Sequence, residues 1–195
     1  SVSLSSTGNV VALGAPFGGE RGYARVFEWD GQSWLKRGSD IQGEAAGDWS
    51  GYSISLSGSG DDLAIGAFYN DDGGENSGHV RVHRWDGISW VQRGEDLDGE
   101  AAQDQSGRVV SFSSDGSTVA IGSTNNGPAY QNYGHVRVYG WENGSWIQKG
   151  AGLVGDFVNE RKGYSVSLSS RGSIVAVGSG HRAQVFEWSG QSWFQ

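Results

Sequence analysis

A six-residue segment with a tryptophan at each end occurs four times in this chain, and it constrains the fold more than any other feature. The copies run from Trp29 to Trp34, from Trp85 to Trp90, from Trp141 to Trp146 and from Trp188 to Trp193. Three copies have glycine first in the central pair, as a type II′ hairpin turn requires, and the third has Asn143-Gly144, which suits type I′. The two tryptophans then face each other one residue pair beyond the turn, where cross-strand side chains come closest. The segment therefore predicts four β-hairpins.

Each hairpin is the last part of a longer repeat. The repeats begin at residues 1, 53, 109 and 165 with Ser-Val-Ser-Leu or a close variant, so the successive offsets are 52, 56 and 56 residues. A turn with glycine follows, and then a second strand with the pattern Ala-x-Gly. The third strand ends at the first tryptophan of the hairpin, and the fourth begins at the second tryptophan. Four short antiparallel strands in about fifty residues are typical of a β-propeller blade, whereas the rungs of a β-solenoid are usually shorter.

The chain is therefore predicted to be all-β, with a single β-propeller region over residues 1–195. It is built from four four-stranded antiparallel blades with a repeat of 52–56 residues. The approximate blade boundaries are 1–50, 51–106, 107–162 and 163–195. Four blades could close into a ring by themselves or form part of a larger propeller, and the sequence leaves both alternatives open. A part of a larger ring would expose strand faces that favour association.

Composition argues against several classes of function. The net charge of −8, from 14 basic and 22 acidic residues, disfavours nucleic acid as a partner. No apolar run has membrane-spanning length, so we expect no membrane insertion. The absence of cysteine excludes disulfides and thiolate metal sites. Because the chain also lacks methionine, we expect an excised repeat region or the ordered part of a longer protein.

Three segments of the second repeat resemble the FG-GAP repeat of integrin α-subunit propellers. They are Gly51–Leu56, Asp62–Ala67 and Gly78–Val82. In the first repeat, Leu13–Pro16 is similar to the Gly-Ala-Pro step of that family. The resemblance implies a propeller outside the cell or at its surface, used in adhesion or ligand recognition.

The resemblance also implies calcium in an Asp-rich loop between the first two strands of a blade. Here these loops are residues 6–9, 58–61, 114–117 and 170–173, and none has enough carboxylates for the six or more oxygen ligands of Ca²⁺. We therefore expect no cofactor in them. Asp71, Asp72 and Glu75, in another loop of the second repeat, are a weaker candidate for a calcium site.

The loops between the second and third strands differ most between repeats. In a propeller they share an edge with the connections between blades, and integrin-like propellers contact their ligands at that edge. Tyrosine beside amide and acidic side chains provides aromatic area and adaptable hydrogen bonds. The candidate ligand-binding residues are Tyr69, Asn70, Asp71, Asp72, Asn126, Tyr130, Asn132 and Tyr133. The alternative is that these loops vary because nothing constrains them.

The hairpin tryptophans allow two interpretations. They could stack on sugar rings, as in a propeller lectin, or pack within and between blades. We favour packing, because both tryptophans recur together with the turn. The residues concerned are Trp29, Trp34, Trp85, Trp90, Trp141, Trp146, Trp188 and Trp193.

An acidic segment recurs between the blades, at residues 43–48, 99–104 and 155–160. It could bind cations or supply a catalytic acid and base. However, a feature that is present at three junctions is more often structural, so we expect its carboxylates to cap turns or to pair with a repeated arginine. The repeated arginines are Arg25, Arg81 and Arg137.

The sequence shows no catalytic motif, and we expect a protein without enzyme activity. It lacks the Gly-x-Ser-x-Gly and His-Glu-x-x-His patterns. His79 and His135 occupy the same repeat position as Tyr23 and are interpreted as strand residues. The leading hypothesis is a secreted or cell-surface adhesion or structural module that binds a protein through its loops. The alternative is a glycan-binding lectin with repeated sites at the blades, and in both hypotheses self-association or contact with neighbouring domains of a longer chain is open.

Overall fold

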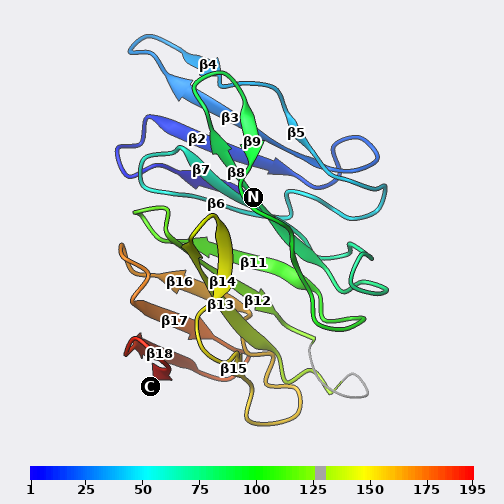
Figure 1. Cartoon of the computed structure of the whole chain (residues 1–195). Coiled ribbons are helices and arrows are strands. Elements are labelled where there is room, and N and C mark those ends of the chain that lie inside the picture. Colours follow the sequence, from blue (N-terminus) through cyan, green and yellow to red (C-terminus); the bar gives the residue numbers. More distant parts are fainter. Residues whose placement is uncertain (126–130) are drawn as a thin grey trace.

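The computed structural model describes residues 1–125 and 131–195, and it shows four antiparallel β-sheets stacked face to face in chain order (Figure 1). The first sheet lies at one end of the stack and the last sheet at the other. This confirms the prediction of an all-β propeller fold with four blades. No helix in the described part of the chain is long and apolar enough to cross a membrane.

The strands follow the chain order within each sheet. The first sheet contains β1 (Val2–Leu4), β2 (Val10–Ala15), β3 (Tyr23–Trp29), β4 (Trp34–Lys36) and β5 (Ile41–Gln42). The second contains β6 (Ser53–Leu56), β7 (Asp62–Ala67), β8 (His79–Trp85), β9 (Trp90–Gln92) and β10 (Leu97–Asp98). The third contains β11 (Ser106–Phe112), β12 (Thr118–Ser123), β13 (His135–Glu142), β14 (Ser145–Gln148) and β15 (Leu153–Val154). The fourth contains β16 (Ser165–Leu168), β17 (Ile174–Gly178), β18 (Ala183–Trp188) and β19 (Trp193–Phe194).

The first three sheets have a short fifth strand that the sequence did not predict. In the first sheet β4 and β5 both pair with β3, β4 near its end and β5 at its start. The outer edge of the blade is therefore one strand with a break in the middle. The break includes Arg37 and Gly38, and the φ of Gly38 is 76°, in the left-handed region that favours glycine.

The hairpin turns have the predicted backbone conformations. Gly31, Gly87 and Gly190 have φ near 100°, and they alone are left-handed in their turns, as type II′ requires. Asn143 and Gly144 have φ of 50° and 86°, so both central residues are left-handed, as type I′ requires. The paired tryptophans face each other across the strands in all four hairpins, with ring centroids 5.1–5.6 Å apart.

The glycine of the Ala-x-Gly pattern allows neighbouring blades to approach closely. A Cβ atom on Gly66 would lie 2.1 Å from the carbonyl oxygen of Gly107, which begins the next blade. Gly14 faces Gly51 in the same way, also at 2.1 Å. Since no side chain fits there, this glycine is required by the stacking of the sheets.

The hydrophobic core lies between the sheets. At the first junction Val10 and Val26 of one sheet pack with Ile54, Leu56 and Ile65 of the next, and all five are buried. The second and third junctions repeat this arrangement with equivalent residues. Burial of such side chains contributes about 1.5–3 kcal/mol each, so the apolar contact between sheets is the main source of stability.

Each end sheet leaves one of these apolar faces uncovered. In the first sheet Leu4 is 58% exposed, although its equivalent in the second sheet, Leu56, is 6% exposed. In the last sheet Val185 is 56% exposed, although its equivalent in the first sheet, Val26, is 1% exposed. The four blades therefore form an open stack and not a closed ring.

A directional contact, which we call the tryptophan clamp, joins each sheet to the next. The indole N–H of Trp90 donates to the carbonyl oxygen of Arg37 at 2.9 Å. The guanidinium of Arg37 lies over the rings of Trp85 and Trp90, 5.1 and 5.7 Å from their centroids. The two equivalent clamps join Arg93 to Trp141 and Trp146, and Lys149 to Trp188 and Trp193. Three of the four tryptophan pairs thus pack between blades.

Trp90→Phe should lower the free energy of unfolding by about 1 kcal/mol, because it keeps an aromatic ring but removes the donor to the Arg37 carbonyl. Trp34→Phe is the matched control, since Trp34 has the same place in the first sheet, which no sheet precedes. Urea unfolding followed by circular dichroism measures both variants. Equal losses in the two variants would contradict the clamp.

Candidate functional site

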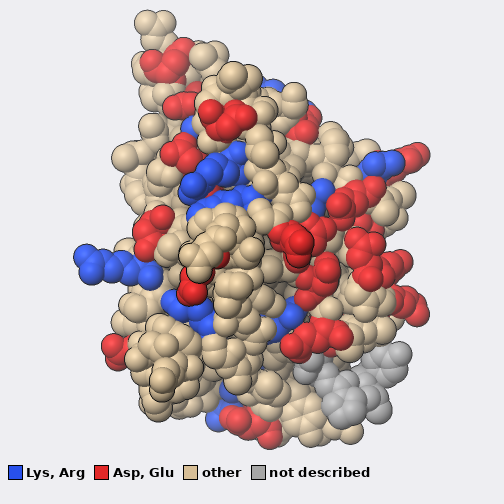
Figure 2. Space-filling view, viewed as in Figure 1, with Lys and Arg blue, Asp and Glu red and all other residues tan. Residues whose placement is uncertain are grey.

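Loops and connections meet at one edge of the stack, which we call the loop edge. It comprises the segments between the second and third strands of a blade, such as residues 68–78, and the connections between blades, such as residues 43–52. The hairpin turns lie at the opposite edge (Figure 1). The predicted placement of loops and connections at one edge is confirmed. Figure 2 shows that Asp and Glu side chains gather along this edge.

Five aromatic side chains form a cluster on the loop edge where the first two blades meet. This aromatic cluster consists of Phe17, Trp49, Tyr52, Phe68 and Tyr69. Trp49 is central, with the rings of Phe17 and Tyr69 in edge-on contact at centroid distances of 4.9 and 4.7 Å. Phe68 is fully buried, whereas Phe17 is exposed and Trp49 and Tyr69 are half-buried. The cluster thus exposes aromatic surface to solvent, and the buried Phe68 holds it from below.

The backbone conformation at Trp49 is the same in three repeats, but the side chain at this position differs between them. Its φ is 58°, and the equivalent Gln105 and Arg161 have φ of 56° and 54°. The left-handed conformation therefore belongs to the repeat and is not particular to Trp49. A fixed backbone that carries a different side chain in each blade suits a role in ligand recognition.

A hollow of about 410 Å³ lies beside the aromatic cluster. Its lining residues are Ala46, Gly47, Asp48, Tyr69, Asp71 and Asn76. Asp48 is buried and accepts hydrogen bonds from the Ala45 backbone N–H at 3.2 Å and from the Asn70 amide at 3.0 Å. The hollow therefore combines a tyrosine ring with a carboxylate held in a fixed position.

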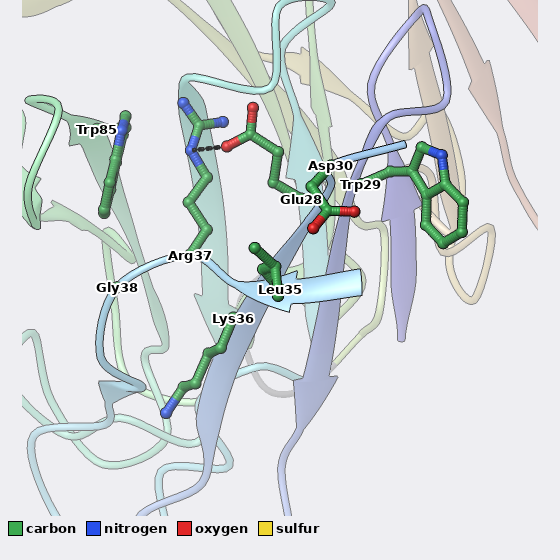
Figure 3. A pocket seen from close by; sticks show the side chains of 8 residues that line it. All are labelled: Glu28, Trp29, Asp30, Leu35, Lys36, Arg37, Gly38 and Trp85. Atoms are coloured by element: carbon green, nitrogen blue, oxygen red, sulfur yellow. Dashed lines mark ion pairs between the residues drawn. The ribbon is translucent and has the colours of Figure 1, made fainter. Parts of the chain in front are cut away.

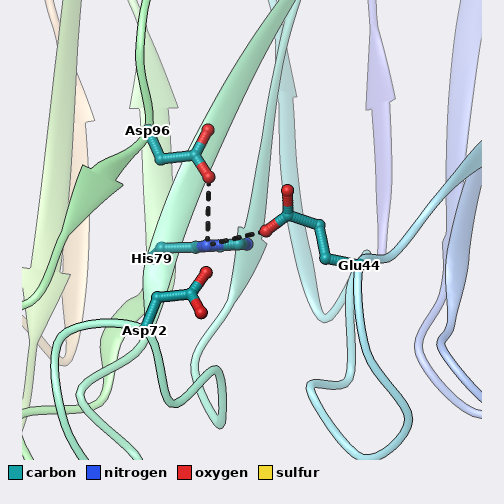
Figure 4. Close-up of side chains that lie close together, drawn as sticks. All are labelled: Glu44, Asp72, His79 and Asp96. Carbon is teal, nitrogen blue, oxygen red and sulfur yellow. Dashed lines mark ion pairs between the residues drawn. The ribbon is translucent and has the colours of Figure 1, made fainter.

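Three carboxylates surround a buried imidazole at the same junction (Figure 4). This His79 cluster consists of Glu44, Asp72, His79 and Asp96, and one ligand atom of each lies within 4.8 Å of the others. Nδ1 of His79 is 3.6 Å from Oε2 of Glu44 and 3.6 Å from Oδ2 of Asp96, which is too long for hydrogen bonds. His79 is 1% exposed, and its Nδ1 has no hydrogen-bond partner among the described residues.

Groups outside the His79 cluster hold two of its carboxylates. The guanidinium of Arg81 lies 3.4 Å from Oε1 of Glu44. The side-chain amide of Gln92 donates to Oδ1 of Asp96 at 2.6 Å. In both carboxylates one oxygen is therefore engaged from outside, and the other oxygen faces His79.

The charges in the His79 cluster shift its pKa values. Burial lowers the pKa of His79, although the neighbouring Asp96 carboxylate opposes this. Burial raises the pKa of Glu44, Arg81 opposes the rise, and the carboxylates of Asp96 and Asp72 add to it. The cluster thus has more negative charge than its cations neutralise, around an imidazole that is uncharged near neutral pH.

The third junction places its arginine differently from the first junction, because Gln184 stands at the position of Arg81. Arg182 occupies the position of His79, six residues before the first hairpin tryptophan. It donates to Glu160 at 2.8 Å and also forms an ion pair with Asp156, the equivalent of Glu44. At this junction the chain itself supplies the positive charge.

The second junction has a histidine but not the full set of acids. His135 occupies the position of His79, and Glu100 that of Glu44. However, Gly152 stands at the position of Asp96. Among the described residues, a group of this kind forms only at the first junction.

The candidate residues of the second blade divide between the two clusters. Asp72 belongs to the His79 cluster, and Tyr69 to the aromatic cluster. Asn70 is buried and donates to Asp72 at 3.4 Å, so it links the acids of this edge. Asp71 and Glu75 were predicted with Asp72 as a weak calcium site, but the group of close ligand atoms does not include them.

The candidate residues of the third blade are only partly described. Asn132 donates to Asn159 at 3.2 Å, and the Tyr133 carbonyl accepts the Lys162 backbone N–H at 2.9 Å. Asn126 and Tyr130 lie outside the described residues. A hollow of about 200 Å³ lies on the loop edge of this blade, lined by Gln105, Arg108, Thr124, Asn125, Arg161 and Tyr164.

A groove of about 370 Å³ lies between the first two sheets on the hairpin side (Figure 3). Its lining residues are Glu28, Trp29, Asp30, Leu35, Lys36, Arg37, Gly38 and Trp85. Arg37 lies 3.5 Å from Glu28 and 2.6 Å from Asp61 while it covers the Trp85 ring. An equivalent groove of about 480 Å³ lies between the second and third sheets. Trp29 and Trp34, by contrast, are exposed.

The acidic segments between blades behave mainly as predicted. The last carboxylate of each segment caps it by accepting a backbone N–H: Asp48, Asp104 and Glu160. Arg81 lies near Glu44, and the equivalent Arg137 makes a longer contact of the same kind. Arg25 differs, because its guanidinium forms a two-pronged pair with Asp40 at 2.8 and 2.7 Å.

The sequence interpretation missed Trp49 and gave His79 only a strand role. The signal for Trp49 was its place as the one tryptophan outside the hairpins, where other repeats have glutamine or arginine. The signal for His79 was the arginine at its equivalent position in the last repeat. Both signals lie in the differences between repeats.

Comparison with known proteins supports the family resemblance and the fold. The model of the family described as FG-GAP repeat matches residues 42–82, so the resemblance is confirmed for that segment, which includes both Trp49 and His79. A solved structure assigned as TolB from Agrobacterium tumefaciens is similar, with a TM-score of 0.57 and 13% sequence identity. The similarity covers 100% of this chain and 60% of that chain, and at this identity it shows the fold alone. No curated protein matches this chain.

His135→Gln should make the protein less sensitive to acid. Burial lowers the pKa of His135 from 6.5 to about 3. As the pH falls below 6.5, the unfolded chain takes up a proton that the folded chain does not, so the folded state loses stability. Between pH 7 and pH 4.5 we expect wild type to lose about 2 kcal/mol more than the variant. Urea unfolding at the two pH values measures this, His181→Gln is the control at an exposed histidine, and equal losses in wild type and His135→Gln would contradict the assignment.

Proposed function

We propose that this protein is a non-enzymatic recognition module, secreted or at the cell surface, that binds a protein partner through the loop edge of its first two blades. The aromatic cluster around Trp49 carries this proposal. Tryptophan and tyrosine dominate the energetics of protein interfaces when they lie at the centre of a patch and are anchored from below. Trp49 and Tyr69 have this arrangement, since both are half-buried and contact the buried Phe68.

The surroundings of the aromatic cluster indicate the character of the partner. Carboxylates lie next to it in the adjoining hollow and in the His79 cluster. An acidic rim favours a partner with lysine and arginine around an apolar centre, and it mainly increases the rate of association. Such a rim is screened by salt, so binding should weaken as the ionic strength rises.

Two observations support a location outside the cell or at its surface and a function without catalysis. The segment that matches the FG-GAP repeat includes Trp49, and the resemblance implies adhesion or ligand recognition outside the cell. The sequence contains no cysteine and no serine in a nucleophile-elbow pattern. We therefore assign the loop edge a binding role.

A test starts from the surface and secreted proteins of the source organism. The whole chain is immobilised, the bound proteins are identified, and the dissociation constant of the purified partner is measured with each variant. Trp49→Ala should weaken binding at least 30-fold, because a central tryptophan at an interface is worth about 2 kcal/mol or more. Trp34→Ala, on the hairpin side, should change it less than twofold.

The exposed Trp29 and Trp34 favour a glycan-binding function as the second candidate. Both indole rings are exposed, and Figure 3 shows the Trp29 ring turned away from Arg37, so its face could stack on a sugar ring. The same two variants separate the candidates on a glycan array. Glycan binding that Trp34→Ala abolishes and Trp49→Ala leaves unchanged would overturn the protein-binding proposal.

A further inference from the structure

We propose that the His79 cluster binds a divalent transition-metal ion, best matched by Zn²⁺, through Nδ1 of His79 and one carboxylate oxygen each of Glu44, Asp72 and Asp96. The four ligands come from four segments of the first junction. Glu44 lies in the connection before β6, Asp72 in the loop between β7 and β8, His79 at the start of β8, and Asp96 just before β10. A bound ion would therefore join the first blade to the second.

The distances in the His79 cluster fit coordination better than hydrogen bonding. Zn²⁺ binds histidine nitrogen and carboxylate oxygen at about 2.0–2.2 Å, so two ligands of a tetrahedral ion lie about 3.3–3.6 Å apart. Nδ1 of His79 is 3.6 Å from the nearest oxygen of Glu44 and of Asp96. These two separations match those of a tetrahedral ion, and all four ligand atoms lie within 4.8 Å of one another.

The buried imidazole is the independent observation that points to a ligand. His79 is almost fully buried, yet its Nδ1 has no hydrogen-bond partner among the described residues and is directed at the carboxylates (Figure 4). Leaving such a group unsatisfied destabilises the folded state, and a metal ion would satisfy it. Outer groups that hold the second oxygen of Glu44 and of Asp96 are also typical of metal sites, where they orient the ligands.

The third junction pairs one arginine with two carboxylates, whereas the His79 cluster has three carboxylates beside the single Arg81. There the guanidinium of Arg182 lies between Asp156 and Glu160. At the first junction three carboxylates face the uncharged side chain of His79, so the positive charge has to come from Arg81 alone or from an external ion. We take this difference between equivalent positions as the reason for a site in one blade.

The ligand set selects the kind of ion. Ca²⁺ and Mg²⁺ bind oxygen ligands, and Ca²⁺ needs six to eight of them. An imidazole with three carboxylates suits Zn²⁺ and related ions better. The expected site therefore differs in place and in chemistry from the Asp-rich calcium loop that the family resemblance implies.

Metal titration of the whole chain tests the proposal, and the probe is Zn²⁺ alone. After removal of metal with a chelator and exchange into buffer at pH 7.5, calorimetry should show one Zn²⁺ site per chain. His79→Arg copies the residue of the third junction, so we expect it to fold and to weaken binding at least 100-fold. Asp96→Gly copies the residue of the second junction and should weaken binding at least tenfold. His135→Gln is the matched control and should retain wild-type affinity.

Several outcomes would overturn the metal site. The proposal fails if wild type shows no saturable Zn²⁺ binding, or if His79→Arg binds Zn²⁺ as wild type does. Ca²⁺ that displaces Zn²⁺ at equal concentration would exclude the imidazole as a ligand. A rise in the melting temperature with Zn²⁺ in wild type, absent in His79→Arg, would confirm the site independently of calorimetry. Because no protein partner is present, these results do not depend on the proposed function.

Discussion

The tryptophan clamp is the interaction on which the stacked architecture depends. Apolar faces alone would allow one sheet to slide over the next, because the hydrophobic effect has no direction. The hydrogen bond from Trp90 to the Arg37 carbonyl and the cation above the indole rings fix the position of each sheet on its neighbour. The break in the outer strand is part of the tryptophan clamp. It leaves the carbonyl of Arg37 to pair outside its own sheet, and the next blade provides the donor.

Because the contact between blades is the same at every junction, the residues that depart from the repeat become informative. The backbone at Trp49 is shared with two other blades, but its aromatic side chain is not. A carboxylate recurs at the position of Glu44 in each connection between blades, but the residue at the position of His79 changes from histidine to arginine. Residues that recur in every repeat therefore serve the fold, and residues that differ between repeats can give one blade a function that the others lack.

Features governed by local chemistry could be predicted from the sequence, and features governed by contacts between distant segments could not. Turn types and strand pairing follow from residues next to one another, as Asn143 and Gly144 show. The short fifth strands were missed because they pair with the start of the third strand, which lies before the hairpin in the sequence. Asn70 resembles an exposed loop residue, but it is buried because it bonds to Asp48, which lies 22 residues earlier in the chain. Likewise the ligands around His79 are separated by up to 52 residues, from Glu44 to Asp96, and no local pattern unites them.

The aromatic cluster and the His79 cluster are connected by the segment that carries both Glu44 and Trp49. Asp48 lies between them, accepts a hydrogen bond from its own segment, and is bonded to Asn70, which in turn bonds to Asp72. An ion held by Glu44 and Asp72 would therefore restrain both ends of this hydrogen-bonded chain, and with them the backbone that positions Trp49. Restraint of a recognition residue before binding reduces the entropy lost on association. Since such coupling is reciprocal, a partner that orders Trp49 would also strengthen the binding of the ion.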